Sequence, residues 1–598
     1  MRQMKSQSKA TAVSPAITKG GDMFDLPIGL RTRLTRATLL TAGMMFWAAI
    51  PRIGACACPG ATNDGIPIVS GFPADIPGGA SCATLTDAAQ FAWKEFIALN
   101  WPAVARIDNA QPRDTADPSQ LFGNPGFTGP LVWHTFRGKV EIFPGQGEPP
   151  GYNANESDDY GYDARPAYNY KIPITAYRGI AYGPTPWINL DENSQIGLNQ
   201  IYAGILSPNV KSDDAQILFM AKANRKEYAY VAANQLLGGV SDKRVAGIFE
   251  ATAKYISDHG DDPLPPCSGL ICLPYGSVEV KAAWRRLTAS ERASGRFYTT
   301  RVRYYVKGDG ADTKTYYVDD DFGLIGLHII QKTSSAPYFI YATFEQADNI
   351  LDAAGKPVED MDGKYIANPI PPIPLYPNIV SKNAQPGTLQ QFSYSPKNFS
   401  SPPGARLYYQ NTAQTGLVDG GPIIVNRRIN QIPDEIIAVN KSAHDAISMY
   451  SQKNFGAKNS VWSYYKLVNV QSKPLTGKKP GIDYSNEDRS VQSTYYQSNG
   501  VIETDYNLQK FSGTFVNFDK FSFRITDFSD GTKNQFNNVT YNHDSVNMGG
   551  CMGCHGNAQK AGTGFSFILL HGSVPMPDQA GQPVTKEQIA RFTKYFSK

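Results

Sequence analysis

The chain has 598 residues, of which 57 are Lys or Arg and 53 are Asp or Glu, so its formal net charge at pH 7 is +4. A charge so close to neutral, without a large basic cluster, argues against a nucleic-acid-binding protein. Charged residues make up only 18% and aromatic residues 12%, with 33 Tyr, 54 Gly and 42 Pro. This composition is typical of an exported protein rich in loops and strands, and it predicts an α+β fold with a β-rich body and a few helices.

The start of the chain predicts an export leader. Arg31, Arg33 and Arg36 form a basic region ahead of an apolar run of 14 residues at 37–50. Such a run is too short for an ordinary membrane span and has the length of a signal-peptide core. If translation starts at Met23, the leader has an ordinary length. Because no consecutive Arg pair precedes the apolar run, we expect general secretion rather than the twin-arginine route.

Two ways of processing this leader remain open. Ala55-Cys56-Ala57 fits a small-x-small cleavage site, which makes Cys58 the first mature residue. The residues at 53–56, Ile-Gly-Ala-Cys, also resemble a lipobox, and in that case Cys56 carries a lipid anchor. Simple cleavage predicts a periplasmic bacterial protein, whereas the lipobox predicts the same protein anchored to the membrane by lipid. No later apolar run approaches 18 residues, so we expect no transmembrane span in the mature chain.

Three segments have helical periodicity. The first runs from a cap at Thr84 or Thr86 to Leu99, the second spans 244–259 before a glycine, and the third spans 434–453. The first segment carries apolar residues at i, i+3, i+4 and i+7, which is typical of a helix packed on a core. These apolar positions are Leu85, Ala88, Ala89, Ala92, Trp93, Phe96 and Leu99.

The centre of the chain alternates between apolar and polar residues or carries short apolar runs, and both patterns predict β-strands. Strands are expected at 302–306, 316–318, 324–330, 338–344 and 461–470, and a Gly-Asp-Gly turn follows the first of them.

His328 lies among aliphatic residues in the predicted strand 324–330. Alternation places its side chain on the same face as Leu324 and Ile330. A histidine in such a setting is most often a core residue with a satisfied hydrogen bond, but a neutral imidazole is also a common metal ligand. Both interpretations stay open at this point.

The motif that carries the chemistry is Cys551-Met552-Gly553-Cys554-His555, near the end of the chain. Two thiols about one helical turn apart can add across the two vinyl groups of a porphyrin, and the adjoining imidazole then binds the iron from the proximal side. We therefore predict one covalent haem c, with Cys551 and Cys554 as the attachment residues and His555 as an iron ligand.

Three other uses of this cysteine pair are compatible with the residues. Together with Cys267 and Cys272, the pair could form a zinc site. A thioredoxin-like redox pair fits less well, because no βαβ pattern surrounds the motif and Gly549-Gly550 indicates a loop that opens into a short helix. A plain structural disulfide is the third use.

Once the leader is processed, an even number of cysteines outside the motif is left to form disulfides. Cys267 and Cys272 lie in a short loop flanked by prolines, and we predict that they form a disulfide in an oxidising compartment. Cys58 and Cys82 then pair with each other, and Cys56 is either removed with the leader or lipidated.

The distal side of the haem has several candidate ligands. Only 43 residues follow His555, which is too few to enclose a porphyrin, although they include a candidate strand at 565–570. The body must therefore form one wall of the pocket and can supply the sixth iron ligand. His328 is the leading candidate, Met576 between two prolines and His571 are local alternatives, and a vacant iron position is the remaining one.

A set of short segments is distinctive when taken together. These segments are Phe91-Ala92-Trp93, Phe96-Ile97-Ala98-Leu99-Asn100-Trp101-Pro102, Lys281-Ala282-Ala283-Trp284, Gly326-Leu327-His328-Ile329, Lys332-Thr333, Ala342-Thr343-Phe344-Glu345-Gln346-Ala347-Asp348-Asn349 and the haem motif. Together they resemble one family, the large bacterial exported cytochrome c proteins with a single haem. The resemblance runs from about Cys82 to Phe567, and it implies one covalent haem in a periplasmic protein without implying a substrate. Two positions depart from the pattern, because His134 stands where an acidic residue is expected and Gln346 stands where relatives carry His.

The predicted organisation is a leader at 1–57, a β-rich body of one or two subdomains at 58–540, and a small cytochrome c-like haem-binding segment at 541–598 packed on the body. Two functions fit it. The first is electron transfer to or from a redox partner protein. The second is a haem oxidoreductase of the peroxidase or oxygenase kind, with an open iron position and a substrate cleft in the body. The size of the body favours an enzyme or a specialised partner, but no second haem, other metal motif or nucleophile elbow is present, so we prefer electron transfer.

Overall fold

The computed structural model divides the chain into two units, Met1–Cys56 and Ala57–Lys598, and every described residue belongs to the second. The predicted leader and the predictions for Cys56 and Cys58 lie outside the described residues. The structure describes residues 65–104, 113–143, 162–163, 165–166, 168, 170, 174–181, 183–192, 217–349, 357, 359–366, 378–381, 407–410, 432–456, 459–473, 499–502, 538–541, 544–547, 550–574 and 576–580.

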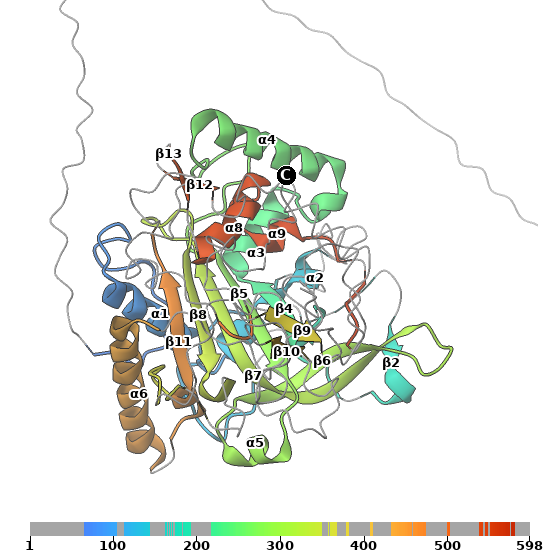
Figure 1. Cartoon of the computed structure of the whole chain (residues 1–598). Coiled ribbons are helices and arrows are strands. Elements are labelled where there is room, and N and C mark those ends of the chain that lie inside the picture. Colours follow the sequence, from blue (N-terminus) through green and yellow to red (C-terminus); the bar gives the residue numbers. More distant parts are fainter. Residues whose placement is uncertain are drawn as a thin grey trace, which may run out of the picture. The chain divides into compact units, whose positions relative to one another are not determined.

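The fold is α+β, with helices packed around a mixed sheet of nine strands, as Figure 1 shows. The helices are α1 (Leu85–Leu99), α2 (Lys139–Ile142), α3 (Arg225–Ala233), α4 (Lys243–His259), α5 (Ala289–Ser294), α6 (Asp434–Phe455), α8 (Gly550–Lys560) and α9 (Phe567–Leu570). The strands are β1 (Arg137–Gly138), β2 (Thr175–Ala176), β3 (Ile188–Leu190), β4 (Leu218–Ala223), β5 (Val278–Arg285), β6 (Thr299–Lys307), β7 (Thr315–Gln331), β8 (Ile340–Gln346), β9 (Asn378–Ser381), β10 (Leu407–Gln410), β11 (Tyr465–Gln471), β12 (Asn538–Tyr541) and β13 (Asp544–Asn547).

The predicted helices are confirmed together with their end signals. Thr84 caps α1 through a reciprocal pair of hydrogen bonds with Asp87, in which each side chain accepts from the other residue's backbone N–H. Helix α4 ends at Gly260, which adopts the left-handed conformation that glycine tolerates best. The third predicted helix is α6, which runs two residues beyond its expected end.

The strands expected at 316–318 and 324–330 are parts of one long strand, β7. Its first half pairs with β6, and its second half lies between β5 and β8, which itself pairs with β11. The expected strand at 461–470 begins later than predicted, because 461–464 form a short 3₁₀ turn ahead of β11. His328 therefore lies on a central strand with neighbours on both sides.

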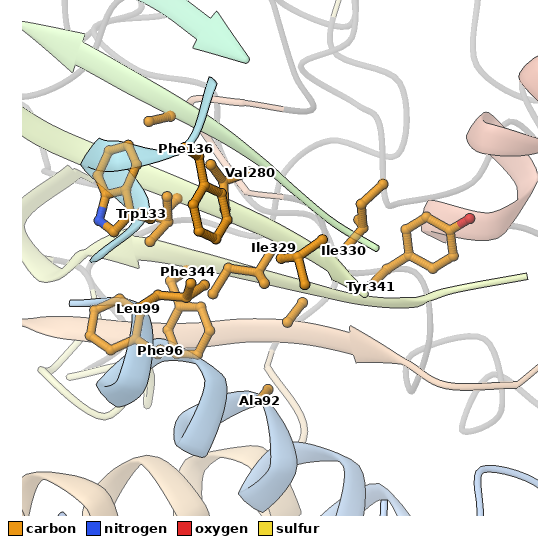
Figure 2. Packing of buried hydrophobic residues seen from close by; sticks show 14 of the residues in the cluster. Ala92, Phe96, Leu99, Trp133, Phe136, Val280, Ile329, Ile330, Tyr341 and Phe344 are labelled. Atoms are coloured by element: carbon orange, nitrogen blue, oxygen red, sulfur yellow. The ribbon is translucent and has the colours of Figure 1, made fainter. Parts of the chain in front are cut away.

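One face of this sheet packs on the main hydrophobic core, and we call it the core face. Its members include Val280, Leu327, Ile329 and Phe344 from β5, β7 and β8. Helix α1 covers it, and the rings of Phe96 and Phe344 stack with centroids 4.4 Å apart. Figure 2 shows this packing, with the α1 side chains directed toward the strands.

The opposite face carries polar side chains at its centre, and we call it the site face. Lys281 of β5, His328 of β7 and Thr343 of β8 are direct cross-strand partners, so their side chains share this face. Asn469 of β11 continues the row beyond Thr343. Such a row is unusual for a buried sheet, since buried polar groups must find partners.

A β-bulge corrects one expectation about this face. Ala283 pairs with Gly326 but Trp284 pairs with Leu324, so Ile325 is an extra residue in β7. The bulge reverses the alternation beyond Gly326. Leu324 therefore shares the core face with Trp284, whereas the prediction placed it beside His328 and Ile330 on the other face.

Candidate haem-binding site

The cysteine–histidine motif lies in the first turns of α8, at the end of the sheet and close to α4 (Figure 1). The expected short helix is confirmed and begins at Gly550, while the loop expected before it lies outside the described residues. Cys551 and His555 are four residues apart, so they project from the same side of the helix, and both are buried. The side chain of Cys554 lies outside what the structure describes.

A hydrogen bond to the backbone fixes the orientation of the His555 ring. Its Nδ1 lies 2.8 Å from the carbonyl oxygen of Phe565, which requires a proton on Nδ1 and leaves the lone pair on Nε2. Phe565 has a φ of 69°, a left-handed conformation that non-glycine residues rarely adopt. A backbone carbonyl on one imidazole nitrogen is the arrangement that fixes the tautomer and orientation of metal-binding histidines.

The structure brings His328 and His555 together, although they are more than 200 positions apart in the sequence. Their ring centroids are 6.0 Å apart and the ring planes are nearly perpendicular, at 87°. Two imidazoles on opposite sides of one metal ion have centroids about 6 Å apart, since each nitrogen–metal bond is about 2 Å and each ring adds about 1 Å. The observed separation is therefore compatible with both imidazoles binding one metal ion.

Burial keeps both imidazoles neutral. It is the largest cause that lowers the pKa of His328 to about 3 and that of His555 to about 4, with the nearby positive charge of Lys281 as a further cause. The neutral imidazole is the form that binds a metal ion. At pH 7, both side chains are thus in the ligand state.

Aromatic and apolar groups surround the pair. The rings of Tyr341 and Phe567 each lie 4.8 Å from the ring of His555. Gly326, two residues before His328 on β7, lies under Val501 and Ile502, and a Cβ at this glycine would lie 3.0 Å from both. A second apolar cluster adjoins the site face there, formed by Ile217, Phe219, Ala283, Leu287, Phe297, Ile325, Val501 and Ile502. The donor set and this lining fit a haem, whose faces are apolar.

Lys281 adds charge next to the two histidines. Its Nζ lies 3.1 Å from Glu192 Oε2, and the other Glu192 oxygen is paired with Lys139. Both lysines lower the pKa of Glu192 well below its ordinary value by Coulomb attraction, against the effect of burial. No separate sequence signal marks this cluster, apart from the position of Lys281 in one of the segments that carry the resemblance.

Two contacts fix the motif helix to the body. The backbone N–H of Met552 donates to Gln471 Oε1 on β11 at 2.9 Å, and the Met552 side chain is fully buried. Gly562, just after α8, lies so close to α4 that a Cβ would come within 1.9 Å of the Phe249 carbonyl oxygen. Only glycine fits this approach, and the helix is thereby held against both α4 and the sheet.

The local candidates for the distal position lie differently from His328. The Met576 side chain is 39% exposed, and His571 is half-buried, with its ring 5.5 Å from the ring of Phe567. The strand expected at 565–570 is wrong, because Ser566 caps the short helix α9 with its hydroxyl on the Leu569 N–H. Among the described residues, the body thus contributes the imidazole of His328 beside His555.

The expected disulfide between Cys267 and Cys272 is confirmed. It contradicts the zinc interpretation, in which these two thiols would be metal ligands. Among the described residues, no group of three or more His, Cys, Asp or Glu side chains is arranged to hold a metal ion. Cys82 is also disulfide-bonded, and its predicted partner Cys58 lies outside the described part of the chain.

The two positions that depart from the family pattern lie away from the site face. His134 is fully buried on the core-face side, with its ring 6.4 Å from the ring of Trp284. Gln346 ends β8 and accepts from the backbone N–H of Asp348. Neither residue contributes to the arrangement around His555.

Comparison of the chain with protein-family models, with curated proteins and with solved structures gives no match. The candidate site is therefore supported by its geometry and by the motif alone. Within the described residues, the helices are all too short or too polar to cross a membrane.

Proposed function

We propose that the protein is a c-type cytochrome that carries one covalent haem and transfers electrons. Cys551 and Cys554 would attach the haem, and His555 and His328 would be the residues that hold its iron. The observation that carries the proposal is the pairing of two buried, neutral imidazoles with centroids 6.0 Å apart, one of them in the Cys-x-x-Cys-His motif. The bound haem would supply a one-electron iron centre at this position.

The residues of the chain fit electron transfer better than catalysis on the iron. With His555 and His328 on opposite sides, no open iron position remains for oxygen, peroxide or substrate. Rigid ligands also suit a carrier, because little must reorganise when the charge on the iron changes. His555 is fixed by the Phe565 carbonyl, and His328 is fixed in a strand paired on both sides. A haem oxidoreductase with a vacant distal position remains the alternative.

The cellular setting follows from the leader and the cysteines. We place the protein in the bacterial periplasm, as a cleaved protein or, through Cys56, as a lipid-anchored one. The disulfide between Cys267 and Cys272 supports an oxidising compartment, where haem c is also attached. The electron donor or acceptor is then a redox partner protein that docks near the haem.

A haem-retention experiment tests the attachment. The chain is exported from a bacterium that matures c-type cytochromes, denatured, and stained for haem on a gel. We expect the wild type to keep its haem and the Cys551→Ser/Cys554→Ser double variant to lose it. As a matched control, Cys267→Ser/Cys272→Ser also removes two thiols and should keep the haem. Haem that extracts from the denatured wild type into acidic acetone would overturn the proposal.

A further inference from the structure

A pair of buried glutamates lies at the junction between the body and the haem-binding segment. Glu227 of α3 is fully buried and Glu279 of β5 is 5% exposed. Their carboxyl groups interact with each other and with the hydroxyl of Ser566, the cap of α9. Neither Glu227 oxygen has a partner with regular hydrogen-bond geometry among the described residues. Two buried carboxyl groups that face each other cannot both be ionised, so this pair must bind a proton.

The pair lies close to the proposed iron ligands. Glu279 is directly opposite Ile330 on β7, and Lys281 is directly opposite His328. Glu279 is therefore a diagonal neighbour of His328 on the site face, at a distance of about 7–8 Å between Cα atoms. In a buried setting of low dielectric constant, charges at such separations interact strongly.

Charged groups from neighbouring elements also face the pair. Lys332 directly follows β7 and interacts electrostatically with Glu227 and with Asp262, which lies shortly after the end of α4. Asp262 in turn accepts a hydrogen bond from Gln559 of α8. Burial lowers the pKa of Lys332 to about 8 and raises the pKa of Asp262 to about 6. The cluster thus touches the haem-binding segment through both Ser566 and Gln559.

We propose that the Glu227–Glu279 pair is a proton-binding site that couples proton uptake to electron transfer at the haem. This inference rests on the proposed function. When the site gains one electron from the partner protein, the pair takes up one proton from water, and it releases the proton when the electron leaves. The net charge of the buried site then stays constant through the cycle.

The sign of the pH dependence follows from this balance. Burial is the main cause that raises the pKa of Glu279 to about 7 and that of Glu227 well above its ordinary value. The extra positive charge of the oxidised site lowers the pKa of the pair, so near pH 7 the reduced protein holds a proton that the oxidised protein has released. Reduction therefore becomes harder as the pH rises through this range.

The test is the reduction potential of the purified, haem-loaded protein between pH 6 and pH 8. We expect the potential to fall with rising pH, by at most 59 mV per pH unit, which is a tenfold change in the equilibrium constant for one electron. Glu279→Gln and Glu227→Gln should flatten this dependence, because a neutral amide of the same shape takes up no proton. Glu95→Gln, which changes a buried glutamate of α1 on the core face, should leave it intact.

A second measurement uses only the wild-type protein, so it does not require that the variants fold. Reduction of the wild type in a weakly buffered solution with a pH-sensitive dye should consume protons, and the infrared difference spectrum should show a new protonated-carboxyl band. A potential that is constant between pH 6 and pH 8 without proton uptake would overturn the coupling while leaving the cytochrome assignment intact. A slope that both glutamate variants retain would also overturn it. Loss of the cytochrome assignment itself would appear earlier, as a protein that binds no haem.

Discussion

At the scale of single residues, burial decides which form each titratable side chain adopts. His328 and His555 are neutral because their site excludes water, and the Phe565 carbonyl selects the tautomer of His555. The same physics keeps a proton on buried carboxyl groups, such as Glu95 on α1. Neither Glu95 oxygen has a hydrogen-bond partner among the described residues.

Glu95→Gln is expected to change the pH dependence of stability. Burial raises the pKa of Glu95 well above that of the unfolded chain, so the folded protein holds a proton that the unfolded chain releases as the pH rises above about 4.5. This difference lowers the free energy of unfolding by up to about 1.4 kcal/mol per pH unit above that point. The variant should remove this decline, and urea unfolding at pH 5 and pH 8 measures it.

Glu291→Gln is the matched control for this prediction. The Arg285 guanidinium and the backbone of Thr288 hold the pKa of Glu291 below its ordinary value, although burial opposes them. Its contribution to stability is therefore constant above about pH 5 and is lost only as the pH falls. A loss of stability that is equal at pH 5 and pH 8 is expected. If Glu95→Gln gave the same uniform loss, the account of Glu95 would be wrong.

At the scale of elements, one side chain joins α1, α6 and β11. Asn440 of α6 accepts from Trp93 Nε1 at 2.8 Å and from the Leu467 N–H at 3.1 Å. Its amide nitrogen donates to the carbonyl oxygens of Leu467 and Asp362. One buried amide thus makes all four hydrogen bonds and aligns the two helices on the core face of the sheet.

Asn440→Ala should destabilise the protein by about 3 kcal/mol, because it leaves several buried donors and acceptors without partners. The midpoint of chemical unfolding measures this effect. Lys441→Ala is the control in the same helix, since its pair with Asp445 is exposed and should contribute less than about 0.5 kcal/mol. Equal losses in the two variants would contradict the role assigned to Asn440.

The helices and strands also show which features of the fold local sequence signals can predict. Caps and periodicity predicted α1, α4 and α6, because each signal lies within a few residues of the structure that it specifies. The bulge at Ile325 could not be predicted in this way, since it depends on the register between β5 and β7. The same holds for α9, where the cap at Ser566 competes with a run of residues that resembles a strand.

At the scale of the whole molecule, the two faces of the sheet have different roles. Its core face packs against α1 and stabilises the fold, while its site face presents His328 to the motif helix α8. The body would thereby supply one of the two imidazoles of the proposed haem site.

The site could be predicted in part from the sequence. The motif predicted its own three residues, because covalent attachment of a haem would fix their spacing. His328 entered as one candidate among several, since a single histidine in an apolar strand has no signature of its own. Glu227 and Glu279 gave no signal, because Glu227 follows Arg225-Lys226 and looks like the exposed start of a helix. Only the tertiary structure shows that both glutamates are buried and face each other.

In the proposed cytochrome, His328 and His555 would both bind the iron of one covalent haem. The absorption spectrum of the reduced protein with and without carbon monoxide tests it most directly, because a six-coordinate iron resists this ligand and an open iron binds it. We expect the spectrum of the wild type and of Met576→Ala to be unchanged by carbon monoxide, and that of His328→Ala to shift. A shift in the wild type, or a His328→Ala variant whose iron still resists carbon monoxide, would contradict the account.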